Sequence, residues 1–136
     1  MGHSHTQSKI PLPNWYDIET GILNMNSKYN MIYAPGFGVT IIKQSSPTDK
    51  PNKKKLKESY NKANHNRKNY VNNNITHMAD EYKKEIKDNY RISMIQKKRD
   101  INEIKDIIRH SNLKEQCEFY NKELKKHGVE LIYINP

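Results

Sequence analysis

The pattern of apolar and polar residues is most regular over residues 75–128. Apolar side chains recur there in steps of mostly three or four residues, which places them in one stripe along a helix. This part of the chain contains no proline, and its single glycine is its last residue, so nothing in it breaks a helix. The pattern predicts a mostly α-helical protein built on a long amphipathic helix over about residues 75–127, with Asn74 as N-cap and Gly128 as C′ residue.

The stripe is interrupted near its C-terminal end. Its spacing lengthens from Ile108 to Leu113, across His110, Ser111 and Asn112, so a kink or break is expected near residues 110–112. Elsewhere the spacing does not keep a clean heptad. A long autonomous coiled coil is therefore disfavoured relative to a helix that docks on an irregular surface.

Residues 1–51 differ from the helix because they contain most of the six prolines and the only tryptophan. Two β-leaning runs, residues 29–33 and 39–43, flank Pro35 and Gly36, which predicts a short hairpin. An isolated hairpin is only marginally stable in water, so its aromatic side chains need a surface to pack on. We expect a non-globular, extended arm that contacts a partner through aromatic anchors, and the alternative is that they pack on the chain's own helix. The anchors proposed for partner binding are Trp15, Tyr33 and Phe37.

Residues 52–74 form a basic segment between the arm and the predicted helix. Its lysines include Lys53, Lys54 and Lys55, and a helix is expected to begin near Pro51 and to be interrupted by the asparagines at 72–74. Such a cluster is either a solvated linker or a surface that binds phosphates or an acidic protein. At the other end of the chain, residues 129–136 form a short apolar tail, either a strand or an anchor.

Composition limits how much core the chain can build. Hydrophobic residues make up 34% of the 136 residues and the mean hydropathy is −1.07, against an apolar share of about 45–50% in typical domains. We therefore expect at most one domain, no self-sufficient core, and an isolated chain that folds poorly. The net charge of +9 predicts an acidic partner without specifying its class.

The residues that could perform chemistry do not form a catalytic signature. Cys117 is the only cysteine, which excludes an internal disulfide and fits a reducing compartment. His110 and Cys117 lie two helical turns apart, about 10 Å, which is too far for both to bind one zinc ion from one helix. No phosphate-binding glycine loop, nucleophile elbow or membrane-spanning segment is present. We expect no enzyme activity, no cofactor and no metal.

The N-terminus allows one modification. If Met1 is removed, Gly2 and Thr6 satisfy the loose pattern for N-myristoylation, although His3 is an unfavourable neighbour. If Met1 stays, its amine and His3 could chelate copper or nickel. A solvated tail is the expectation that needs neither modification nor metal.

The C-terminal segment carries a family resemblance. Residues 113–131 read LKEQCEFYNKELKKHGVEL. They resemble the end of small, almost wholly helical microtubule inner proteins of ciliary and flagellar doublets, where a basic helix leads to Tyr-x-x-Glu-Leu-x-x-x-Gly and a short apolar tail. Gln116 stands where that pattern has glutamate, and the tail carries Glu130 and Tyr133. The matching residues are Tyr120, Glu123, Leu124 and Gly128, with Leu131 in the tail. The resemblance leads us to expect that the first four contribute to partner binding.

The resemblance implies a structural protein of the axonemal cytoskeleton. Such a protein binds tubulin and neighbouring inner proteins in the microtubule lumen and stabilises the lattice. Two alternatives remain open on the residues alone. One is a basic, RNA-associated component of a large assembly, such as a mitochondrial ribosomal protein, and the other is a myristoylated scaffold at the cell cortex.

Overall fold

The computed structural model describes residues 2–4 and 10–136, and these divide into two compact units. The first, here called the mixed unit, contains the described residues up to Arg67 and residues 113–136. The second, the helical unit, contains residues 68–112. The helix α2 (Lys53–Glu85) contributes its first half to the mixed unit and its second half to the helical unit.

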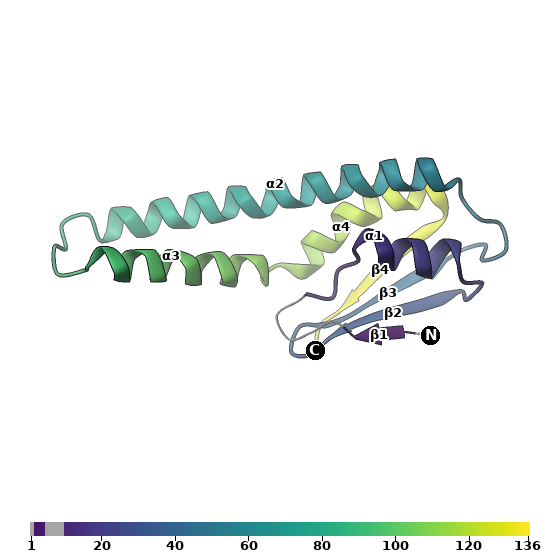
Figure 1. The fold of residues 1–136 in the computed structure, drawn as a ribbon, viewed down its shortest axis with the longest axis horizontal. Helices are drawn as coiled ribbons and strands as arrows, with labels where there is room; N and C mark the ends of the chain where they lie inside the picture. The colour runs from purple at the N-terminus through teal and green to yellow at the C-terminus, as the bar shows by residue number, and fades with distance from the viewer. Residues whose placement is uncertain (1, 5–9) are drawn as a thin grey trace. The chain divides into compact units, whose positions relative to one another are not determined.

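The mixed unit combines a small sheet with helices on one of its faces (Figure 1). The strand order is β1-β2-β3-β4, with β1 parallel to β2 and the other neighbours antiparallel. A short helix α1, extended by a π-helical turn η1, precedes the β2–β3 hairpin, and α4 with a 3-10 turn η2 leads into β4. The bounds are β1 Gly2–Ser4, α1 Trp15–Ile18, η1 Glu19–Leu23, β2 Tyr29–Ala34, β3 Gly38–Gln44, α4 Leu113–Leu124, η2 Lys125–His127 and β4 Val129–Ile134.

The core of this unit lies between the sheet and the helices α1, α2 and α4. Alternate residues of β2, β3 and β4 face it, as the period of a half-buried sheet requires. The expectation that the chain lacks a core of its own is wrong for this unit. Apolar residues from the segment before α2, from the first half of α2, and from α4 and β4 meet there. The buried cluster comprises Leu12, Ile18, Ile22, Ile32, Ile42, Leu56, Tyr60, Ala63, Leu113, Cys117, Tyr120, Leu124, Val129 and Leu131.

From residue 10 onward, the predicted arm is not extended. Asn14 caps α1, because its side-chain oxygen accepts from the Asp17 backbone N–H at 2.8 Å. In return, the Asp17 carboxylate accepts from the Asn14 backbone N–H at 3.0 Å. The hairpin is confirmed, since Tyr33 pairs with Val39 and Ala34 with Gly38. It does not stand alone, because the apolar tail is a third strand, β4, that pairs along β3. The predictions for Met1 and Thr6 fall on residues outside the described part of the chain.

Asn121 joins α4 to β4. Its side-chain amide donates to the Leu131 carbonyl at 2.7 Å, and its amide oxygen accepts from the Leu131 N–H. Because the side chain satisfies both backbone groups of this buried residue, it substitutes there for a further strand.

The single helix predicted over residues 75–127 is wrong in its bounds. The break near residues 110–112 is confirmed, with Asn112 at a φ of 52° between α3 (Met94–Arg109) and α4. A second break separates α2 from α3. Ser93 caps α3, because its hydroxyl accepts from the Gln96 backbone N–H at 3.1 Å. The main helix α2 begins at Lys53, close to Pro51 as expected, and it continues through residues 72–74 without the predicted interruption.

In the helical unit, the second half of α2 and α3 lie side by side and antiparallel (Figure 1). The apolar residues of α2 here, Val71, Ile75 and Ala79, recur every four residues and are buried. The Tyr82 hydroxyl of α2 donates to the Asp100 carboxylate of α3. The isoleucines on the corresponding stripe of α3 are half-buried, and they are Ile101, Ile104 and Ile108.

Candidate partner-binding surfaces

Two of the residues proposed from the sequence to bind a partner lie inside the mixed unit. Tyr120 and Leu124 are exposed by 1% and 0% of their surface. The Tyr120 ring stacks on Tyr60 with 5.7 Å between centroids, and its hydroxyl donates to Asn64 and accepts from Arg67, each at 2.9 Å. Burial raises the pKa of Tyr120. These contacts give Tyr120 a packing role, and Leu124 belongs to the same buried cluster, so neither lies on the surface that a partner would meet.

Glu123 and Gly128 also serve the local fold. The Glu123 carboxylate is buried and accepts from Lys126 at 2.7 Å, with Lys62 of α2 at 3.6 Å. The hydrogen bond from Lys126 is the main cause that lowers the pKa of Glu123, and Lys62 adds to it. Gly128 has a φ of 71° and ends the helical segment, as predicted for a C′ glycine, and its carbonyl accepts from the Ser45 amide at 2.9 Å.

The Glu123 interactions predict a pH-dependent contribution to stability. Because the pKa of Glu123 is lowered in the folded chain, its ion pairs stabilise the fold above its ordinary pKa of 4.5 and are lost as the pH falls through the lowered value. We expect Glu123→Gln to be less stable than wild type at neutral pH, and the difference to narrow in acid. Urea unfolding from pH 7 to pH 3 measures it. A difference that stayed constant with pH would contradict this role.

The three aromatic anchors have different surroundings. Trp15 and Phe37 are partly buried against the core. The ring centroids of Trp15 and Tyr60 lie 5.9 Å apart, as expected if the aromatic residues pack on the chain's own helix. Tyr33 is 47% exposed on the face of the sheet that points away from the helices. Of the three, it is the one whose ring is largely available to a partner.

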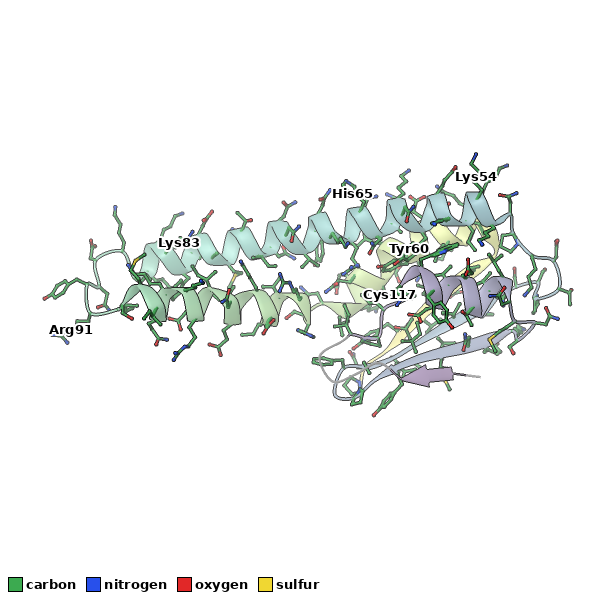
Figure 2. All side chains as sticks on the ribbon, in the orientation of Figure 1. Lys54, Tyr60, His65, Lys83, Arg91 and Cys117 are labelled. Carbon is green, nitrogen blue, oxygen red and sulfur yellow. The ribbon has the colours of Figure 1, made fainter. Side chains whose placement is uncertain are left out.

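The lysines that open α2 are exposed. Lys53 forms an ion pair with Glu19 at 3.1 Å, whereas Lys54 and Lys55 extend from the first turns of the helix. Figure 2 shows Lys54 and His65 on the side of α2 that points away from α4. The first half of α2 therefore presents a basic outer surface, as the sequence indicates.

A groove in the helical unit was not predicted from the sequence. It has a volume of about 500 Å³ and lies between the end of α2 and the start of α3. Its lining combines apolar side chains with four lysines and contains no carboxylate. The lining residues are Tyr82, Lys83, Ile86, Met94, Lys97, Lys98, Ile101, Asn102 and Lys105.

The α3 part of this groove follows a visible sequence pattern. Met94, Lys97, Lys98, Ile101 and Lys105 are separated by steps of one, three and four residues, which puts them on one face of a helix. From this pattern alone, the apolar members are expected in a core stripe and the lysines on a solvated face. What the sequence does not show is that the end of α2 supplies the opposite wall.

The described residues offer no clear centre for catalysis. Cys117 is exposed by 1%, and burial raises the pKa of its thiol to about 12, so it is protonated at neutral pH and unsuited to nucleophilic attack. Among the described residues, no three His, Cys, Asp or Glu side chains gather closely enough to hold a metal ion. Within the same part of the chain, no helix has the length and apolar character that crossing a membrane requires.

Comparison with known proteins does not assign the chain to a family. No protein-family model matches it, and no curated protein or solved structure matches it significantly. The candidate surfaces above therefore have to be interpreted from their own chemistry.

Proposed function

We propose that this chain is a structural protein that binds an acidic protein surface, and that its partner is tubulin in the lumen of axonemal doublet microtubules. The lysine-lined groove of the helical unit is the observation that carries the proposal. The resemblance of residues 113–131 supplies the identity of the partner.

The composition of the groove favours a protein over a nucleic acid. Met94 and Ile101 give it apolar surface, while Lys83, Lys97 and Lys98 surround that surface with positive charge. A phosphate backbone needs the charges but gains little from the apolar part. A protein segment with acidic and apolar side chains uses both, because complementary charge guides its approach and apolar burial holds it.

The exposed lysines of α2 extend this basic character to the mixed unit. Lys54 and Lys55 add positive charge on a helix that carries little acidic charge nearby, since Glu58 is the only carboxylate among its first sixteen residues. Lysines that recur along a helix as long as α2 suit contact with a regular, extended lattice. In this proposal the chain lines the lattice and stabilises it without catalysing a reaction.

Co-sedimentation of the purified full chain tests the partner class. We expect the chain to pellet with microtubules and to be released as salt screens the lysines. Pelleting with RNA but not with microtubules would overturn the proposal in favour of the RNA-associated alternative, for which the Lys53–Lys55 cluster is the relevant surface.

A pair of charge-matched variants tests the groove. We expect the triple variant Lys83→Glu, Lys97→Glu, Lys98→Glu to bind microtubules at least about tenfold more weakly, because the charge that guides the partner is reversed at the contact. The control is Lys28→Glu, Lys114→Glu, Lys122→Glu, which makes the same change in net charge at exposed sites of the mixed unit. Equal loss of binding in both variants would show that only overall charge matters.

Localisation tests the specific assignment. A tagged copy in a ciliated cell is expected to remain with axonemes after salt extraction, as a lumenal protein should. Its complete loss into the soluble fraction would contradict a position inside the doublet.

A further inference from the structure

The sheet of the mixed unit has a second face, which points away from the helices (Figure 1). On β2, β3 and β4, the residues between the buried ones project to this side. This outer face is formed by Tyr29, Met31 and Tyr33 of β2, by Val39, Ile41 and Lys43 of β3, and by Glu130, Ile132 and Ile134 of β4.

Two of the three cross-strand rows on this face are wholly apolar. One row pairs Met31 with Ile41 and Ile41 with Ile132, and the next pairs Val39 with both Tyr33 and Ile134. A solvated sheet face is ordinarily polar, whereas Met31 is 47% exposed, Ile132 36% and Ile134 49%. A contiguous exposed apolar surface of this kind marks an interaction site.

The third row determines which partner fits. Lys43 lies directly opposite Glu130 across β3 and β4, next to Tyr29. Neither side chain forms an ion pair within the described part of the chain. Because Lys43 and Glu130 are the only charged residues among the nine that form this face, its net charge is zero, in contrast to the +9 of the whole chain. It therefore has no excess positive charge to attract a nucleic acid or an anionic membrane.

A positive charge beside a negative one is complementary to its own copy. A twofold axis that runs along the strands between β3 and β4 exchanges the two strands, so Lys43 of one copy meets Glu130 of the other, twice. The same rotation places Ile41 over the second copy's Ile132, and Val39 over its Ile134. The rings of β2 then lie at the rim of the contact.

We infer that the outer face of the sheet is the interface of a symmetric dimer, formed by two copies of this chain with their sheets packed face to face. Aligned sheet packing of this kind, with about 10 Å between sheets, buries both apolar surfaces. The inference rests on the mixed unit and is independent of the groove and of the proposed microtubule partner.

Exchange of the two charges between copies tests the dimer. Sedimentation equilibrium of the full chain should show a reversible dimer, and Lys43→Glu and Glu130→Lys should each weaken dimerisation at least about tenfold. Mixing these two variants should restore it, because the carboxylate introduced at position 43 of one copy then meets the ammonium group introduced at position 130 of the other. Each variant keeps its own unfavourable cross-strand pair in the mixture, so recovery can only come from contacts between copies.

A second pair of variants separates the interface from general effects of added charge. Ile132→Asp should be monomeric, while Ile95→Asp, at a 74% exposed site on α3, should dimerise as wild type does. Circular dichroism melting checks that each variant is folded. A wild type that stays monomeric at about 100 µM overturns the inference, as does failure of the mixed variants to associate. Wild-type binding to phospholipid vesicles that Ile132→Asp abolishes would also overturn it, by showing that lipid is the occupant.

Discussion

Replacing Tyr120 with alanine is expected to destabilise the chain by about 3–5 kcal/mol. The ring is 1% exposed and stacks on Tyr60, so its removal leaves a cavity in the core and takes away a stacking partner. The hydroxyl loss adds to this, because the Asn64 and Arg67 side chains each lose a hydrogen bond. Urea denaturation followed by circular dichroism measures the change.

Two matched variants identify the cause of the Tyr120 effect. Tyr120→Phe keeps the ring and should cost about 1–3 kcal/mol through the hydrogen bonds alone. Tyr16→Ala removes a ring that is 70% exposed and should change stability by less than about 0.5 kcal/mol. If Tyr120→Ala left stability unchanged and instead weakened binding to a partner, Tyr120 would be the surface anchor that the family resemblance implies.

Gly38→Ala is expected to destabilise the sheet by about 2–5 kcal/mol, from backbone strain of about 1–2 and overpacking of about 1–3 kcal/mol. Gly38 begins β3 with a φ of 106°, which L-residues rarely adopt. An added Cβ would also collide with the backbone carbonyl of Ile134 in β4. Because this neighbour is backbone, it cannot rotate away, and the two strands must separate.

Gly36→Ala is the control for the steric part of this prediction. Gly36 also has a positive φ, of 82°, but an added Cβ meets nothing within 4 Å. It should therefore cost only the strain of about 1–2 kcal/mol. Equal thermal stability of the two variants would show that the approach of β4 to Gly38 is not tight.

The elements that the sequence predicts correctly are those set by local chemistry. The hairpin is recognisable because Pro35 and Gly36 separate two β-leaning runs, and the left-handed Gly128 is recognisable because it follows a run of helix formers. The break at residues 110–112 is visible as a shift in the apolar stripe. Each of these features depends on residues that are close together in the chain.

The predictions that failed depend on distant residues. The asparagines at 72–74 have weak helix propensity, yet the buried stripe of α2 continues on both sides of them, and packing outweighs local preferences of a few tenths of a kcal/mol per residue. Low overall hydrophobicity indicated too little core, but it does not show that the few apolar residues of α1, β2, β3, α4 and β4 collect in one place. The same limitation hid the groove, whose second wall comes from another helix.

By itself, the sequence determined the helical character of the chain, its basic charge, its hairpin and one helix break, because periodicity, net charge and turn chemistry are local or additive properties. Only the tertiary structure decided that Tyr120 and Leu124 are core residues, that β4 completes the sheet, and that lysines and apolar residues line one groove. Those outcomes depend on which segments meet in space, and contacts between residues far apart in the chain leave no periodic trace in a single sequence.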